Sequence, residues 1–277
     1  MSELTSDRIQ YYTQIAVEAS RQGSEILLDH WGKLKQIKEK STAGDLVTEA
    51  DQLSEECVLK FLRKECPDHT IISEESGLHN VEGSDFTWAV DPLDGTTNYA
   101  HQIPIFAVSI ALIYRGNPVV GVVYNPFVDE LFVAGKDQGA FLNGQKLSVS
   151  NVDTMGKSIL ATGFAYDRRD TPDNNYAEFC YLTSQTQGVR RMGSAALDLA
   201  YVASGRFDGF WERGLNVWDI AAGTVLVREA GGVVSSYENG PLELKSGRIL
   251  ATNGLIHVET SKTLQKVHDN IPPILFS

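Results

Sequence analysis

Two aspartates of the sequence, Asp91 and Asp94, have a spacing that suits metal binding. They follow a short β-prone run, and Pro92 between them fixes one backbone angle and lacks an N–H. Gly95 then permits a sharp turn. Such a turn would direct both carboxylates, and the carbonyl oxygen of Leu93, toward one point. Hard cations such as Mg²⁺ bind oxygen sets of this kind, so the segment is a candidate metal site.

The residues after this turn suit a phosphate. Thr96 and Thr97 can begin a helical turn whose free backbone N–H groups would bind phosphate oxygens. A metal site and an anion site would then be adjacent in sequence. The alternative is an ordinary Asp-rich turn capped by Asp94 or Thr96, and the segment alone does not decide between the two.

Further acidic residues lie at the starts or ends of other predicted elements. Glu74 and Glu75 follow a short strand, Asp51 lies near the start of a helix, and Asp219 opens a later Ala-rich helix. Each has an ordinary explanation by itself, such as solvation or helix capping. Together they are spread over both halves of the chain, which favours a metal site between the halves.

The elements that would position these residues are helices and short strands in a mixed α+β layout. Apolar residues at helical spacing predict helices at 7–31, 49–65, 176–186, 193–204, 219–230 and 257–268. Turn-bounded β-prone runs predict strands at 70–73, 86–90, 107–114, 119–124, 131–134, 140–142, 158–163, 233–236 and 248–252. The polar stretch before the second helix is predicted to be a loop. That helix is predicted to bury Ala50, Leu53, Cys57 and Phe61.

A polar segment of small residues at 148–157 divides the chain. We expect a domain boundary there, because linkers between domains have this composition. The prediction is an N-terminal α+β domain at 1–150 that carries most of the candidate metal ligands. A C-terminal α/β domain at 151–277 would supply Asp219 and contacts to the substrate.

The composition argues against one class of protein. The 277 residues carry a formal net charge of −12, the wrong sign for a general nucleic-acid binder, whose phosphate contacts need Lys and Arg. This acidity suits an enzyme acting on phosphates if its carboxylates hold cations, because bound ions invert the local field.

Cysteine usage and hydropathy indicate where the protein resides. Cys57, Cys66 and Cys180 lack the spacing of a disulfide framework or a zinc site. The N-terminus has no apolar signal core, and no apolar run approaches the roughly 20 residues that span a bilayer. We therefore expect a cytoplasmic protein without membrane partners.

Several blocks of the sequence together resemble a known family. They are DLVTEAD at 45–51, EES at 74–76, WAVDPLDGTTN at 88–98, WDIAAG at 218–223 and EAGG at 229–232. In composition, order and spacing these blocks are similar to those of the inositol monophosphatase family. The resemblance spans the chain from about residue 8 to residue 265, and the longer blocks are highly specific.

This resemblance implies a layered α/β/α/β/α sandwich of the inositol monophosphatase and fructose-1,6-bisphosphatase type, and a homodimer. It implies two or three Mg²⁺ ions per site, and inhibition by Li⁺, which competes for a Mg²⁺ position. Asp51 would hold a further metal ion through water. The implied direct metal ligands are Glu74, Asp91, the carbonyl oxygen of Leu93, Asp94 and Asp219.

The resemblance also assigns catalytic and substrate-binding residues. Thr96 and Asp51 would orient the attacking water, with Glu74 as a further catalytic residue. The backbone of Gly95 and Thr96 would bind the phosphate, and Lys40 matches a lysine near the phosphate entrance. The other implied substrate contacts are Asp94, Gly193, Ser194, Ala195, Glu212 and Asp219.

The expected reaction is Mg²⁺-dependent hydrolysis of a small phosphorylated polyol, in the first place inositol-1-phosphate, by in-line attack of activated water without a covalent intermediate. The alternatives are phosphatases of histidinol phosphate, a sugar 1-phosphate or fructose 1,6-bisphosphate. Glu212 favours a polyhydroxylated substrate, because a carboxylate accepts hydrogen bonds from ring hydroxyls, but it also suits the amine of histidinol. A third alternative is a regulatory protein that kept the fold.

Overall fold

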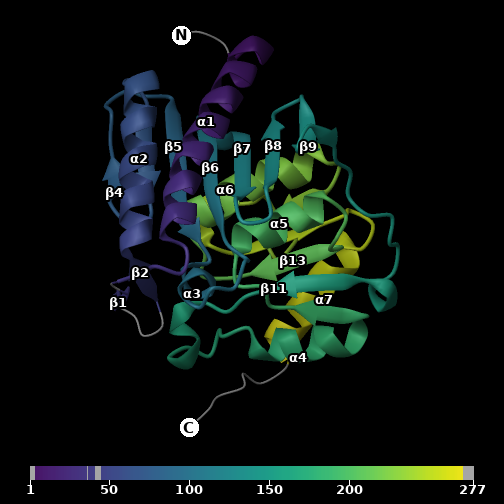
Figure 1. The fold of residues 1–277 in the computed structure, drawn as a ribbon. Helices are drawn as coiled ribbons and strands as arrows, with labels where there is room; N and C mark the ends of the chain where they lie inside the picture. The colour runs from purple at the N-terminus through teal and green to yellow at the C-terminus, as the bar shows by residue number, and fades with distance from the viewer. Residues whose placement is uncertain (1–3, 36, 41–44, 271–277) are drawn as a thin grey trace.

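The computed structural model describes residues 4–35, 37–40 and 45–270. Part of the predicted loop before the second helix, and the end of the predicted C-terminal domain, lie outside these described residues. Within them, helices and sheets alternate in an α/β/α/β/α order (Figure 1). The observed layers are those that the resemblance led us to expect.

Two long helices, α1 (Ser6–His30) and α2 (Glu49–Glu65), form the first layer and pack against one face of an eight-stranded sheet. At the start of α2, Thr48 and Asp51 form a capping box, which satisfies backbone N–H groups that the helix leaves free. Both helices closely match their predicted bounds. The predicted loop between them instead contains a short hairpin of β1 (Ile37–Glu39) and β2 (Leu46–Thr48).

The buried face of α2 differs from the predicted one. Ala50 is buried as expected, but Leu53 is 41% exposed, and the buried residues include Asp51, Ser54 and Glu55. The prediction was wrong at Leu53, because it assumed an apolar stripe without polar members. On this helix, polar side chains are buried because they contact other segments of the chain.

The eight-stranded sheet has the strand order β10-β9-β8-β7-β6-β5-β3-β4. Neighbouring strands in this sheet are antiparallel except for β3 and β5, which run parallel, with Ser73 opposite Val90. Glu74 and Asp91 therefore leave two adjacent strands at the same edge of the sheet. The strands are β3 (Thr70–Ser73), β4 (Gly77–His79), β5 (Phe86–Asp94), β6 (Ala107–Tyr114), β7 (Asn117–Asn125), β8 (Glu130–Gly135), β9 (Gly139–Leu142) and β10 (Gln145–Lys146).

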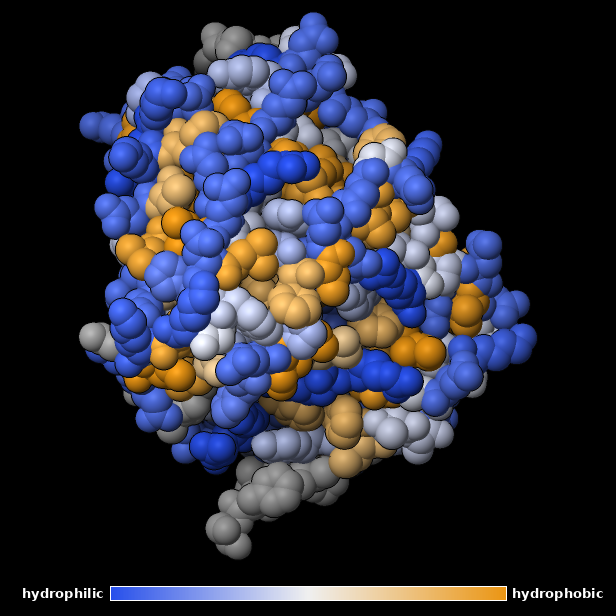
Figure 2. All heavy atoms as spheres, viewed as in Figure 1, coloured by the Kyte–Doolittle hydropathy of each residue, from blue (hydrophilic) through white to orange (hydrophobic). Residues whose placement is uncertain are grey.

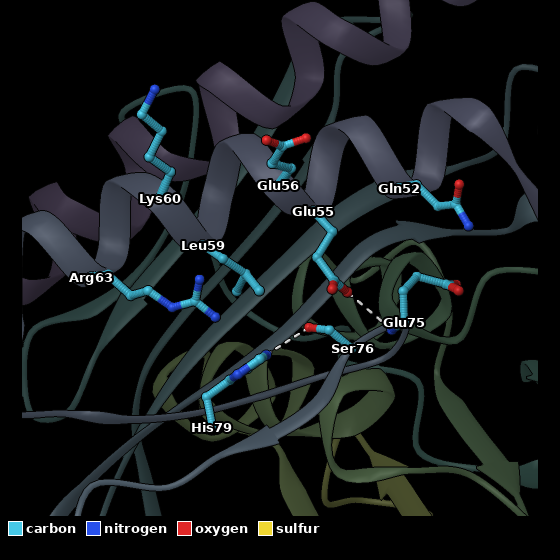
Figure 3. A pocket seen from close by; sticks show the side chains of 9 residues that line it. All are labelled: Gln52, Glu55, Glu56, Leu59, Lys60, Arg63, Glu75, Ser76 and His79. Atoms are coloured by element: carbon cyan, nitrogen blue, oxygen red, sulfur yellow. Dashed lines mark hydrogen bonds between the residues drawn. The ribbon is translucent and has the colours of Figure 1, made fainter.

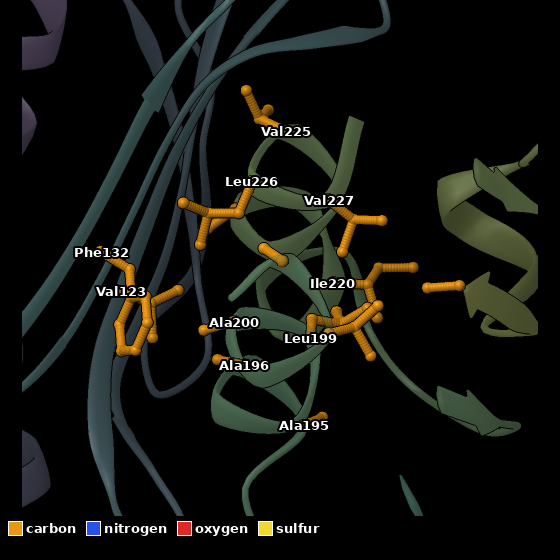
Figure 4. Packing of buried hydrophobic residues seen from close by; sticks show 14 of the residues in the cluster. Val123, Phe132, Ala195, Ala196, Leu199, Ala200, Ile220, Val225, Leu226 and Val227 are labelled. Atoms are coloured by element: carbon orange, nitrogen blue, oxygen red, sulfur yellow. The ribbon is translucent and has the colours of Figure 1, made fainter. Parts of the chain in front are cut away.

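Two helices, α5 (Ala195–Ala203) and α6 (Val217–Glu229), lie between the two larger sheets. α6 approaches β7 so closely that a Cβ on Gly121 would lie 2.3 Å from the carbonyl oxygen of Ala222. A glycine is therefore needed where the helix crosses the strand. Figure 4 shows the apolar cluster of this layer, which includes Val123, Phe132, Leu199, Ala200, Ile220 and Leu226.

A five-stranded sheet in the order β12-β11-β13-β15-β14 forms the next layer, and α4 (Tyr176–Gln185) and α7 (His257–Asn270) cover its outer face. The sequence analysis missed β13, because it is short and lies between turn-forming residues. The short helix α3 (Thr96–Ala100) begins where the sequence predicted a helical turn. The strands are β11 (Ile159–Thr162), β12 (Gly188–Arg190), β13 (Gly209–Glu212), β14 (Val233–Ser235) and β15 (Ile249–Thr252).

The predicted domain boundary lies between the two larger sheets in sequence, since β10 ends at Lys146 and β11 begins at Ile159. One apolar cluster combines Phe132 of the first half with Leu199 of the second. The division at residue 150 stays a prediction.

The hydropathy of the described helices bears on whether the chain could span a membrane. On the face shown in Figure 2, hydrophobic residues form small groups among hydrophilic ones. Among the described residues, no helix is both long enough and apolar enough to cross a bilayer.

Candidate functional site

The candidate site begins at the end of β5. Its register with β6 shifts between Asp91 and Asp94, and Leu93 N donates a hydrogen bond to Asp91 Oδ1 at 3.0 Å. Gly95 follows with a φ of +94°, and a Cβ there would lie 2.8 Å from the carbonyl oxygen of Ile105. The sharp turn expected from the sequence is present and requires this glycine.

Asp94 connects the two halves of the chain. Its Oδ2 accepts hydrogen bonds from Ser194 Oγ at 2.6 Å and from Ala196 N at 2.7 Å. Ser194 is the N-cap residue of α5. The segment 193–195, predicted to contact substrate, therefore lies directly beside a predicted metal ligand.

Asp51 and Thr96 meet in a buried hydrogen-bond network. Asp51 Oδ2 accepts from Thr48 N at 2.8 Å and from Thr48 Oγ1 at 2.6 Å, while Oδ1 accepts from Thr96 Oγ1 at 2.9 Å. Burial raises the pKa of Asp51 to about 6, although the hydrogen bonds from Thr48 and Thr96 oppose the shift. The two residues predicted to orient water are thus in direct contact.

Glu74, at the end of β3, is paired with a lysine. Lys40 Nζ lies 2.7 Å from Glu74 Oε1 and 2.6 Å from Glu75 Oε1. Burial lowers the pKa of Lys40, but the charges of Glu74 and Glu75 outweigh this effect and raise it. Burial also raises the pKa of Glu75 to about 7, against the hydrogen bond from Lys40. Lys40 therefore lies beside a proposed metal ligand, and its place at the phosphate entrance stays a prediction.

Asp219 joins the site from the start of α6. Its Oδ2 accepts a hydrogen bond from Asn216 N at 2.6 Å, which closes a capping box. Burial raises the pKa of Asp219 well above its usual value, and the charges of Glu74 and Asp94 raise it further. Asp219 therefore interacts electrostatically with acids of the N-terminal half.

Of the acids of the site, Asp91 is buried while Asp94 and Asp219 are partly exposed, and the acids raise one another's pKa values. Burial raises the pKa of Asp91 well above its usual value, and the negative charges of Glu74, Asp94 and Asp219 raise it further. Burial raises the pKa of Asp94 to about 6, while hydrogen bonds from Ser194 Oγ and Ala196 N oppose the shift. Such a group of like charges is unfavourable unless protons or cations neutralise it.

The donor set fits a hard cation. Carboxylate and carbonyl oxygens are the ligands that Mg²⁺ prefers, and their mutual repulsion would be relieved by bound positive charge. Among the described residues, no three Asp, Glu, His or Cys side chains form a preformed metal cluster. Glu74, Asp94 and Asp219 accept protein hydrogen bonds instead.

Comparison with known proteins decides the family. A model of the inositol monophosphatase family matches residues 8–271. The chain belongs to the inositol monophosphatase family. An inositol-1-monophosphatase of Synechocystis is 56% identical over 92% of this chain and 89% of that protein. A Nus factor SuhB of Pseudomonas aeruginosa is 42% identical over 94% of this chain and 97% of its own length.

Solved structures agree with the family assignment. The inositol monophosphatase from Anabaena (Nostoc) is 50% identical, covers 96% of this chain and 98% of its own, and has a TM-score of 0.87. The suhB extragenic suppressor protein from Bartonella henselae is 39% identical, covers 92% and 99%, and has a TM-score of 0.86. The predicted family, layered α+β fold and phosphoric monoester hydrolase class are confirmed.

Glu212, predicted to contact substrate, is the last residue of β13. It is 7% exposed and packs against Gly163, where a Cβ would lie 2.3 Å from its carboxylate oxygens. Burial raises the pKa of Glu212 to about 8; the charge of Arg191 opposes this and that of Asp94 adds to it. Glu212 is therefore close enough to feel the charge of Asp94.

Sequence reasoning missed several residues around the site. Asp198 of α5 is 1% exposed, and its Oδ1 has no hydrogen-bond partner among the described residues. Burial raises the pKa of Asp198 well above its usual value, and the charge of Glu212 adds to this. Arg213, next to Glu212, holds the Asp167 carboxylate with two guanidinium nitrogens, at 3.0 and 2.6 Å from Oδ1. Their types alone carry no signal, because surface acids and arginines are common.

Proposed function

We propose that this protein hydrolyses inositol-1-phosphate to inositol and phosphate, with Mg²⁺ as its cofactor. The observation that carries the proposal is the 2.9 Å contact between the Thr96 hydroxyl and the Asp51 carboxylate, near the interacting acids of β5 and α6. The 56% identity to an inositol-1-monophosphatase supports the choice of substrate.

The proposed cofactor is two or three Mg²⁺ ions. When bound, these ions would screen the phosphate dianion, acidify the attacking water and stabilise the leaving oxygen. Asp51 would contribute through a water molecule. The residues that would bind them directly are Glu74, Asp91, Leu93 through its carbonyl oxygen, Asp94 and Asp219.

Thr96 and Asp51 would take the proton of the attacking water. A water that donates to Thr96 Oγ1 is oriented by a hydroxyl that itself donates to Asp51. Because the pKa of Asp51 is about 6, its carboxylate is ionised at neutral pH and able to receive the proton through Thr96. Attack would be direct, so a phosphoenzyme trapped during turnover would contradict this mechanism.

Other residues would bind the two ends of the substrate. We propose that backbone N–H groups of Gly95 and Thr96 bind the phosphate, with Lys40 at the entrance. Glu212 would bind ring hydroxyls through its carboxyl group, which has both a donor and acceptors when protonated. The further proposed contacts are Asp94, Gly193, Ser194, Ala195 and Asp219.

A panel of substrates tests the proposal. We expect kcat/KM with Mg²⁺ to be highest for inositol-1-phosphate, compared with histidinol phosphate, a sugar 1-phosphate and fructose 1,6-bisphosphate. Li⁺ added to the same assay should inhibit. A higher value for another phosphate would overturn the substrate and leave the reaction class intact, whereas hydrolysis of none of them would overturn the function.

A partner-binding role is a second candidate. Relatives named Nus factor SuhB are 42% and 43% identical to this chain, which favours a regulatory role on the same fold. We place catalysis first, because the Thr96–Asp51 contact has no evident purpose in a protein that only binds a partner.

The proposed assembly is a homodimer in the cytoplasm. Ile103, Phe127 and Val128 are 43%, 46% and 50% exposed, and the ring of Phe127 lies 5.0 Å from that of Trp31. This exposed apolar area supports a contact with a second copy, which light scattering tests. The free cysteines support a reducing compartment.

A further inference from the structure

One face of α2 carries three buried polar residues. Asp51, Ser54 and Glu55 occupy positions i, i+3 and i+4, so they lie on the same side of the helix. Their exposed fractions are 0%, 0% and 4%. Burying a polar or charged group costs free energy unless it is hydrogen-bonded, so this face is explained by what its side chains contact.

Two of these residues contact the segment after β5. Asp51 accepts the hydrogen bond from Thr96, as described above. Ser54 Oγ donates to the carbonyl oxygen of Pro92 at 3.1 Å, inside the turn that carries the two aspartates. Two neighbouring side chains on this face of α2 therefore bind two neighbouring parts of the proposed site.

Glu55 contacts the turn after β3, which carries Glu74. Its Oε2 accepts a hydrogen bond from the backbone N–H of Glu75 at 2.9 Å (Figure 3). On the other side, Glu74 N donates to the carbonyl oxygen of Val90 at 3.2 Å. The backbone at Glu74 is thus held by β5 and by α2.

We propose that Glu55 is a positioning residue, which fixes the turn at 74–76 and so directs the Glu74 carboxylate toward the proposed metal site. The inference rests on the proposed function. In this role Glu55 supplies a hydrogen-bond acceptor, and its side chain must be long enough to reach the backbone N–H of Glu75. An uncharged side chain of the same length should replace it, and a shorter carboxylate should not.

The chain offers a matched control for this residue. Glu56 is the next residue of α2, is exposed, and points away from the turn in Figure 3. Both glutamates line a groove of about 670 Å³ between α2 and the β3–β4 hairpin. Glu56→Ala therefore removes the same charge from the same groove without removing a contact to the turn.

The experiment compares Glu55→Gln, Glu55→Asp and Glu55→Ala with Glu56→Ala. Mg²⁺ affinity is measured on the intact protein by titration calorimetry, and melting temperature without Mg²⁺ is measured separately. We expect Glu55→Asp and Glu55→Ala to bind Mg²⁺ roughly 10- to 100-fold more weakly, as when other outer partners of metal ligands are removed. Glu55→Gln and Glu56→Ala should bind within a few-fold of wild type.

The outcomes separate this inference from its basis. Wild-type affinity in folded Glu55→Asp would overturn it, and so would an affinity loss in Glu55→Gln as large as that in Glu55→Asp. If Glu55→Ala does not fold, the Asp and Gln variants still decide, because both keep a polar group at the site. If wild type binds no Mg²⁺, the proposed metal site fails first.

Discussion

The Thr96 hydroxyl has two acceptors within reach, Oδ1 of Asp51 at 2.9 Å and the carbonyl oxygen of Leu93 at 3.0 Å. It has one proton, which these acceptors share, so its oxygen stays available to accept from a water molecule. Asp51 cannot easily turn away, because Thr48 holds its other oxygen by two hydrogen bonds. At the scale of the residue, the proposed proton path is therefore short and rigid.

Removing this hydroxyl tests the path. Thr96→Ala should lower kcat by roughly 10²- to 10⁴-fold, the usual contribution of a positioned acid–base group. Mg²⁺ affinity, measured by calorimetry, should change little, because the Thr96 side chain is not a proposed ligand. Thr96→Ser keeps the hydroxyl and should retain most of the activity. A Thr96→Ala enzyme within a few-fold of wild-type kcat would rule out the role of the hydroxyl.

At the scale of the element, the packing of α6 against its neighbours determines where Asp219 lies. This helix carries Asp219 in its first turn and is buried along most of its length between the two larger sheets. Its position is set by the crossing at Gly121, where the helix backbone lies against β7. A shift of the helix at this crossing would move Asp219 relative to the acids of β5.

A methyl group at the crossing tests this dependence. Gly121→Ala would place a Cβ 2.3 Å from the carbonyl oxygen of Ala222, so α6 must move. We expect a loss of about 1–3 kcal/mol in the free energy of unfolding, as in other overpacked cores, measured by urea denaturation. Mg²⁺ affinity should fall as well. Gly156→Ala is the control, because a Cβ there would meet no atom of the described residues within 4 Å. Equal stability of the two variants would refute the tight crossing.

At the scale of the whole molecule, the acids of the site could be predicted from the sequence, but not all of the residues that hold them in position. Asp91 and Glu74 could be predicted because acids directly after β-prone runs stand out. Glu55 could not, because a glutamate on a helix is ordinarily solvated, and only the folded chain shows that it is buried against a turn. Asp198 was missed for the same reason. The link from Asp94 to Ser194 joins residues far apart in sequence, so its geometry required the fold.

The buried acids also couple stability to pH across the whole molecule. Burial raises the pKa of Asp51 and of Asp94 from 3.8 to about 6. Between these values the folded chain binds more protons than the unfolded chain, so these groups favour folding at low pH, and this contribution falls as pH rises through the window. Above about pH 6 the folded protein must hold ionised acids close together, which is where a cation stabilises it most.

Mg²⁺ should therefore stabilise the protein in a pH-dependent way. We expect the rise in Tm on adding excess Mg²⁺, relative to EDTA, to be small near pH 5 and to grow toward pH 8, because protons and Mg²⁺ compete for the same carboxylates. Differential scanning calorimetry measures both states at each pH, and the difference removes the effect of acids outside the site. Asp94→Asn should flatten the dependence. A Tm gain that is the same at every pH would show that Mg²⁺ binds somewhere other than these buried acids.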